Sequence, residues 1–173
     1  HQDKAFSDGI ALPKGSTGQS LVRNSQALVN VGYNPTLTWA NPSLLSIEHQ
    51  ILIPLFGENP VEQGITDGNQ AAILQQIRED KVYTALFLNA YPERGGSVSL
   101  DAITQSIACF VRGLISFDSP FDRHQQGDAS ALSAEALRGK ELFFSEKLEC
   151  FHCHGGYNFS DSTIDRNTTQ IER

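Results

Sequence analysis

Cys150-Phe151-His152-Cys153-His154 is the stretch that decides the fold of this 173-residue chain. In a C-x-x-C-H motif, two thiols one helical turn apart can add to the two vinyl groups of a haem, and the adjacent imidazole then reaches the iron as its proximal ligand. The motif predicts covalent haem attachment through Cys150 and Cys153, with His154 as a ligand of the haem iron.

Other uses of these residues stay open. A closed zinc site usually takes four ligands from two separated pairs, and no second Cys or His pair follows in the chain. A redox-active C-x-x-C pair usually lies where a strand leads into a helix, whereas a helical segment precedes this one. Haem attachment is favoured, with zinc and a disulfide as alternatives.

Composition bounds the class of protein. The chain is 39% hydrophobic and 19% charged, as globular domains are, and has the length of one domain or one and a half. Its net charge is −7 and its 13 basic residues form no dense run, which argues against nucleic acid as a partner. No window approaches the length of a membrane span.

Methionine is absent and the first residue is His1, so we expect a processed protein or a piece of a larger one. Without methionine, no Met ligand to a haem iron can come from these residues. The third cysteine, Cys109, lies in an apolar helical pattern and is expected to be a buried thiol without a chemical role.

Apolar periodicity predicts a mainly helical fold, since no strand pattern of any length is present. Residues 1–36 are expected to be irregular, with turns at the glycines of 15–18. Helices are predicted over 43–53, which Pro54 ends, over 70–79 with Asn69 as cap, and over 81–90.

Ser99 is predicted to cap a core helix whose apolar stripe is Leu100, Ile103, Ile107, Phe110, Val111 and Leu114. The polar segment 117–129 is expected to be a loop that contains a domain boundary. Ser133 should cap a last helix that ends near Phe144, and Gly139 in its middle should let another helix cross closely.

A set of ordered motifs then resembles a known family. Gly139, Leu142 and Phe143 before the C-x-x-C-H resemble the opening of a class I cytochrome c domain. The runs LVNVGYNPTLTWANPSL (28–44), FGENPVE (56–62) and ALRGKELFFSEKLECFHCHGG (136–156), with Arg23-Asn24 upstream, resemble the bacterial di-haem cytochrome c peroxidase and MauG superfamily. They look most like MbnH-type enzymes, which are paired with a copper-binding partner protein.

The resemblance implies two cytochrome c-like helical domains with one haem c each. Residues 1–128 would be the later part of the first, peroxidatic domain, and residues 129–173 the start of the second. The first C-x-x-C-H would end at or just before His1, and the rest of the second domain would follow Arg173.

The resemblance also implies site residues. Glu62 matches the distal glutamate that moves a proton between the oxygens of hydrogen peroxide, and Gln50 matches its neighbouring distal glutamine. Trp39 matches the aromatic residue between the haems, and Asn24 a ligand of an interdomain calcium ion. Without the resemblance, these residues have simpler interpretations. Glu62 and Gln50 could be solvated polar side chains, Trp39 a large core residue and Asn24 a surface asparagine.

The implied activity is that of a periplasmic di-haem enzyme that uses hydrogen peroxide to oxidise a residue, a tryptophan by resemblance, on a partner protein. Two alternatives stay open, a peroxidase that takes electrons from a small cytochrome and a haem-binding electron-transfer module without chemistry of its own. In the members of the family that must first be reduced, a histidine in this stretch ligates the first haem iron and closes the peroxide site. No histidine occurs between Gln2 and Glu48, so the resemblance implies a first haem that is open to peroxide without prior reduction.

Overall fold

The computed structural model describes residues 1–34, 36–38, 41, 43–156 and 158–160. Within them the fold is mainly helical, as predicted, and pairing of the strand type is limited to two isolated bridges, Lys14 with Ser20 and Glu58 with Val61. The α-helices are α1 Ile47–Phe56, α2 Gln70–Glu79, α3 Lys81–Ala90, α4 Leu100–Arg112, α5 Pro120–Gln125, α6 Ala134–Phe143 and α7 Cys150–Cys153. The short 3-10 turns are η1 Gln2–Lys4, η2 Val31–Tyr33 and η3 Pro92–Arg94.

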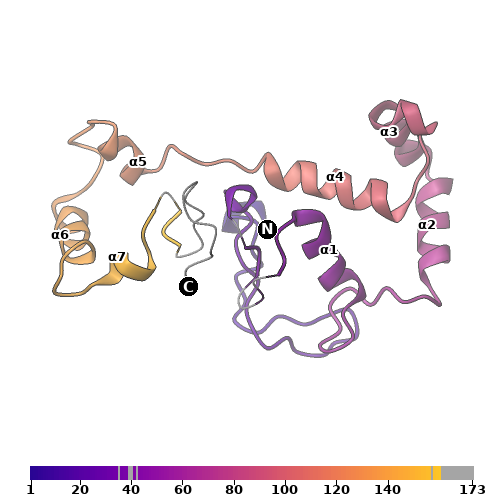
Figure 1. The fold of residues 1–173 in the computed structure, drawn as a ribbon, viewed down its shortest axis with the longest axis horizontal. Coiled ribbons are helices and arrows are strands. Elements are labelled where there is room, and N and C mark those ends of the chain that lie inside the picture. The colour runs from indigo at the N-terminus through magenta and orange to yellow at the C-terminus, as the bar shows by residue number, and fades with distance from the viewer. Residues whose placement is uncertain (35, 39–40, 42, 157, 161–173) are drawn as a thin grey trace.

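Helices α1 and α4 pack against each other and form the main core (Figure 1). Ile47 and Ile51 of α1 meet Ala108 and Val111 of α4 in one buried cluster. The turn η2 also lies against α4, so that a Cβ added at Gly32 would be 3.3 Å from a main-chain atom of Arg112. Leu28 and Val31 of the N-terminal segment thereby pack against the same buried cluster.

A second, smaller cluster joins α3 to the start of α4. Phe87, Val98 and Ala102 are buried together, and the hydroxyl of Tyr91 donates to the Ala102 carbonyl over 3.0 Å. Helix α2 packs on α3 (Figure 1).

The predicted helices over 70–79 and 81–90 are confirmed, but the Asn69 side chain does not cap the first of them as expected. Asn69 occupies the cap position of α2, but its side-chain oxygen accepts from the Thr66 amide instead of a helix amide. Asp80 caps α3 and accepts from the amides of Val82 and Tyr83. A carboxylate at this position satisfies the first free amides and opposes the positive end of the helix dipole.

The prediction of a helix over 43–53 is wrong at both ends. Helix α1 begins at Ile47, because the Ser46 hydroxyl caps it by accepting from the His49 amide. It continues through Pro54 to Phe56. Proline removes one backbone donor, so the Gln50 carbonyl loses its helical partner, and this single loss is tolerated close to the end of the helix.

Helix α4 is capped by Ser99 as predicted, but of the predicted stripe only Val111 is buried. The buried positions include Ala102, Ala108 and Val111, whereas Phe110 is 56% exposed. Small alanine side chains bring α1 and α3 close to the helix axis, and the larger side chains lie beside that contact. Cys109 is exposed, so the expectation of a buried thiol is wrong.

The segment 117–129 is not a plain loop, since it contains the short helix α5. The Ser119 hydroxyl accepts from the Asp122 amide while the Asp122 carboxylate accepts from the Ser119 amide, which is a complete capping box. Helix α6 begins as predicted, with the Ser133 hydroxyl accepting from the Ala136 amide. No described atom comes within 4 Å of a Cβ added at Gly139, so the expected helix crossing there is wrong for the described residues.

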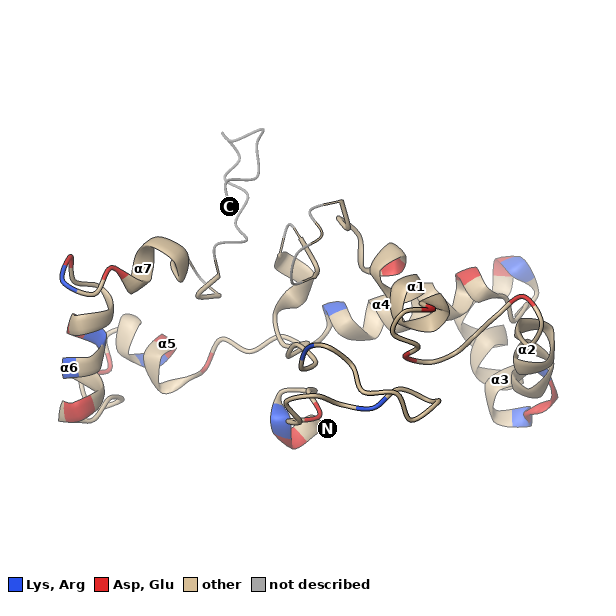
Figure 2. Ribbon diagram, turned by 90° about the horizontal axis from the view of Figure 1, so that it is seen from below, with Lys and Arg blue, Asp and Glu red and all other residues tan. Residues whose placement is uncertain are grey.

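The helices α5, α6 and α7 form a group at one end of the molecule, joined to α4 by an extended stretch (Figures 1 and 2). A side-chain hydrogen bond of 3.1 Å from Asn158 to Asn34 links this group to the N-terminal segment. Figure 2 shows acidic and basic residues interspersed over the described helices. The longest described helix, α4, has 13 residues, and none in the described part has the length and apolar character of a membrane span.

Candidate functional site

The single turn of α7 carries both cysteines of the C-x-x-C-H motif. Cys150 is half-buried and Cys153 is exposed, and both are free thiols. Their three-residue separation in a helical turn places them on the same side of that turn. The pair can therefore reach one planar group together.

His154 follows α7 and is held by the backbone beyond it. Its Nδ1 atom lies 3.2 Å from the Phe159 carbonyl oxygen. Because a carbonyl can only accept, Nδ1 carries the proton in the neutral imidazole, and Nε2 then keeps its lone pair. An imidazole oriented in this way is the usual state of a histidine that ligates a metal through Nε2.

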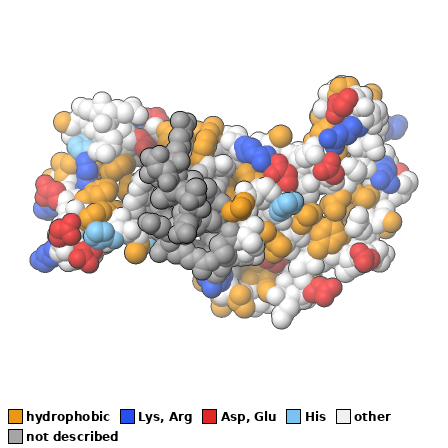
Figure 3. Space-filling view, viewed as in Figure 1, with side chains coloured by type: hydrophobic (Ala, Val, Ile, Leu, Met, Phe, Trp, Pro, Cys, Tyr) orange, Lys and Arg blue, Asp and Glu red, His pale blue; other side chains and the backbone are white. Residues whose placement is uncertain are grey.

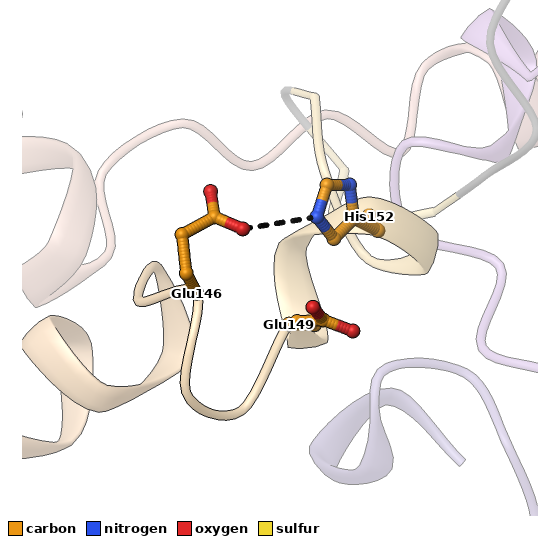
Figure 4. A group of neighbouring side chains, drawn as sticks. All are labelled: Glu146, Glu149 and His152. Atoms are coloured by element: carbon orange, nitrogen blue, oxygen red, sulfur yellow. Dashed lines mark ion pairs between the residues drawn. The ribbon is translucent and has the colours of Figure 1, made fainter.

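The motif's other histidine faces elsewhere. The Nε2 atom of His152 lies 3.7 Å from a carboxylate oxygen of Glu146, and Glu149 stands beside them (Figure 4). Ligand atoms of these three residues lie within 4.8 Å of one another, but all three side chains are exposed. The group is an exposed histidine between two carboxylates, and the role of His154 as iron ligand stays a prediction.

Aromatic side chains gather beside the motif. The ring of Phe159 makes edge contacts with Phe121 at 4.9 Å and with Phe143 at 5.7 Å between centroids, and Phe144 lies next to them. An open cavity of about 230 Å³ is lined by Phe121, Leu132, Ala136, Gly139, Lys140, Phe143, Phe144 and Phe159. Two thiols, an imidazole with a free Nε2 and an apolar aromatic wall fit a covalently bound haem better than a closed zinc site.

The two predicted distal residues lie at the N-terminal core. Gln50 is on α1, and Glu62 is in the loop that follows that helix; both are half-buried. Two hydrogen bonds of 2.9 Å, from the Gln63 amide to the Pro54 carbonyl and from the Ile65 amide to the Leu55 carbonyl, fold the loop back onto the end of α1. The structure therefore ties both residues to the same helix.

Asn24 is exposed, in a segment fixed to residues 7–10. The hydroxyl of Ser25 donates to the Asp8 carboxylate over 2.7 Å, and the Ile10 amide donates to the same oxygen. These bonds lower the pKa of Asp8, the Ile10 amide having the largest effect. Trp39, the predicted bridging residue, lies outside the described residues.

Sequence reasoning missed three features that hold the site. Phe159 acts through its main-chain carbonyl, which no side-chain pattern could reveal. Gly15 lies against the loop of Glu62, and its sequence context indicates only a turn. Arg112 of α4 forms two hydrogen bonds, of 2.7 and 2.9 Å, with Glu48 of α1, across 64 residues of sequence.

Comparison with known proteins shows the family of the chain. Residues 1–130 match the family described as di-haem cytochrome c peroxidase. A solved structure described as a MauG-like protein associated with microbial copper homeostasis is similar over 98% of this chain and 48% of that one. Its TM-score is 0.90 and its sequence identity to this chain is 41%.

Curated relatives agree. The chain is 29% identical to the methylamine utilization protein MauG of Methylophilus methylotrophus, over 94% of this chain and 46% of that protein. It is 35% identical to the cytochrome-c peroxidase IdrP1 of Denitromonas iodatirespirans, over 90% and 40% respectively. The chain thus spans less than half the length of these relatives. On the family match and these identities, the chain belongs to the di-haem cytochrome c peroxidase family.

Proposed function

We propose that this chain is part of a periplasmic di-haem enzyme that uses hydrogen peroxide to oxidise a residue, a tryptophan, on a partner protein. The observation that carries the proposal is the likeness, over almost the whole chain, to the MauG-like protein associated with copper homeostasis. The relatives named MauG support the same choice. Residues 1–128 would then belong to the first domain and residues 129–173 to the second.

Each site residue has a part in this proposal. Cys150 and Cys153 would hold haem c through thioether bonds, and His154 would ligate its iron through Nε2. Trp39 would carry charge between the two haems, and Asn24 would bind calcium through its amide oxygen.

Glu62 would provide acid-base catalysis in the first domain. Bound haem would supply the redox chemistry, in which one hydrogen peroxide takes two electrons and two protons and becomes two water molecules. The Glu62 carboxylate would take the proton from one peroxide oxygen and give it to the other, which must be protonated to leave as water. The Gln50 amide would orient the peroxide, and the partner residue would supply the electrons.

Exchange of Glu62 for glutamine tests this role in the full-length, haem-loaded protein of which this chain is part. We expect Glu62→Gln to slow the reaction with peroxide by about 10²- to 10⁴-fold, because the amide cannot carry the proton. Haem content, read from the Soret band, should not change. Glu58→Gln, an exposed glutamate of the same loop, is the matched control and should react at the normal rate. An unchanged rate in Glu62→Gln would remove Glu62 from the proposal.

A second activity is favoured by relatives named cytochrome-c peroxidase and cytochrome c551 peroxidase. In that case a small reduced cytochrome would supply the two electrons. Sustained peroxide turnover with reduced cytochrome as donor, without oxidation of a partner protein, would support this second activity over the first.

A further inference from the structure

The loop of Glu62 rests on a turn that lies more than forty residues earlier in the chain. Residues 13–21, called the 13–21 turn below, fold back on themselves through hydrogen bonds from Gly15 to Gln19 and from Leu21 to Pro13, of 2.9 and 2.7 Å. A bridge between Lys14 and Ser20 closes the same turn. The turn is thus a structured unit.

The main chain on both sides of the Glu62 α-carbon is bound to this turn. The Ser16 amide donates to the Glu62 carbonyl over a short 2.7 Å, and the Val61 amide donates to the side-chain oxygen of Gln19 over a longer 3.4 Å. On its other side the loop is bonded to the end of α1, as described above. Glu62 is therefore fixed between a turn and a helix.

Gly15 makes the close approach possible. A Cβ added there would overlap the Val61 carbonyl oxygen, and it would be 3.2 Å from the Glu62 α-carbon. Gly15 does not adopt the left-handed backbone conformation, so the need for glycine here comes from space and not from φ. Because the atoms it would meet are backbone atoms, no rotation of a flexible side chain could make room.

These bonds hold the backbone and leave the carboxylate available. Among the described residues, no hydrogen bond or ion pair engages the Glu62 side chain. A proton carrier needs a fixed position together with an uncommitted carboxylate. We propose that the 13–21 turn is a positioning element for Glu62, with Gly15 allowing the contact and Gln19 as its second anchor. This inference rests on the proposed acid-base role of Glu62.

Gly15→Ala in the full-length, haem-loaded protein is the main test. We expect its second-order rate with peroxide to fall at least tenfold and the pH profile of that rate to shift, with an unchanged Soret band. Gly68→Ala is the matched control, because a Cβ there would meet only the Thr66 hydroxyl at 3.7 Å. A normal rate and pH profile in a folded Gly15→Ala protein would overturn the proposal.

The binding of fluoride gives a second test that does not depend on turnover. Fluoride binding to ferric haem takes up a proton on a nearby base, so its affinity, followed by absorption, reports where Glu62 lies. We expect weaker fluoride binding in both Gly15→Ala and Glu62→Gln, and normal binding in Gly68→Ala. In the double variant, Gly15→Ala should add less than a twofold effect to Glu62→Gln, whereas full additivity would show that Gly15 acts through another group.

A variant that is less disruptive than Gly15→Ala keeps the proposal testable if Gly15→Ala does not fold. Gln19→Ala introduces no overlap and should slow the peroxide reaction two- to threefold, since it removes one long hydrogen bond, while Gln19→Glu keeps an accepting oxygen and should stay near normal. A normal rate for Gln19→Ala would overturn the anchor role of Gln19.

Failure of the proposed function would look different. If Glu62→Gln itself reacts normally, the catalytic role of Glu62 is wrong. Protection of the Val61 amide from hydrogen exchange, lost in Gly15→Ala and kept in Gly68→Ala, would then still show that the turn holds the loop. Unchanged protection would refute the positioning element itself.

Discussion

The N-terminal region, residues 1–116, and the C-terminal region, residues 117–160, are built around different centres. The first buries side chains such as Ile47, Ile51 and Ala108 between helices. In the second, no described residue is buried, and Phe144 and Phe159 are 42% and 38% exposed beside the attachment motif. Figure 3 shows hydrophobic side chains at the surface at both ends of the visible face. Side-chain packing therefore organises the N-terminal region, whereas the C-terminal region presents aromatic rings and ligand atoms suited to a prosthetic group.

The largest expected effect follows from removing the attachment thiols. The double variant Cys150→Ser, Cys153→Ser should lose covalent haem at this motif completely, because a hydroxyl does not form the thioether bonds. Since a ligand bound to the folded state stabilises it, amides of α5 and α6 should lose protection from hydrogen exchange. Amides of α1 and α4 should keep theirs.

Mass spectrometry of protein matured in a host that attaches haem c gives the haem count. Cys109→Ser, which removes the exposed thiol outside the motif, is the matched control and should keep its haem. Equal loss of protection in α4 and α6 would contradict the division into two differently built regions.

A smaller effect is expected in the N-terminal core. Ile51 is 7% exposed between α1 and α4, so Ile51→Ala should cost about 3 kcal/mol of the free energy of unfolding, from lost burial and the cavity left behind. Phe144→Ala, at a half-exposed ring, should cost clearly less in haem-free protein. Urea unfolding followed by hydrogen exchange of α4 and α6 amides measures both, and a larger loss for Phe144→Ala would reverse the comparison.

The same contrast explains how far sequence alone could lead. Caps are local, and the serines at 99 and 133 could be identified because each hydroxyl accepts from an amide three residues on. The C-x-x-C-H motif is local too and could be recognised directly in the sequence, while haem attachment at it stays a prediction. Locality alone was not sufficient, because the equally local cap at Ser46 and the capping box at Ser119 were not predicted.

Features set by distant contacts were not predictable. The buried face of α4 is chosen by α1, which reaches its small residues, so Ala108 lies inside and Phe110 outside. Gly15 indicates a turn in the sequence, and its contact with Val61 exists only because two remote segments meet. The role of Glu62 came from resemblance and stays a proposal, because half-burial in a loop does not distinguish a catalytic carboxylate from a solvated one.

Removal of a cap should have a moderate effect confined to one region. Ser99→Ala leaves the Ala102 amide without its 3.2 Å acceptor, so the free energy of unfolding should fall by about 1 kcal/mol. Ser97→Ala, at an exposed position two residues earlier, should change it little. Chemical denaturation followed by circular dichroism measures both, and equal losses would show that the cap contributes nothing specific.

The smallest expected effect is the pH-dependent contribution of one ion pair to stability. Arg112 hydrogen-bonds to Glu48 and holds the pKa of that carboxyl below its ordinary value of 4.5. A depressed pKa means that the ion pair stabilises the fold above about pH 4.5 and loses this contribution as the pH falls through the folded-state pKa. The side chains of Arg112 and Glu48 are 46% and 31% exposed. The ion pair should therefore contribute only about 0.5 kcal/mol to the free energy of unfolding. Glu48→Gln should therefore lower the unfolding temperature slightly at pH 7, and the difference from the unchanged protein should shrink as the pH falls below 4.5. Glu141→Gln on exposed α6 should change it little, and a drop for Glu48→Gln that does not vary with pH would show that packing, and not charge, joins α1 to α4 at this point.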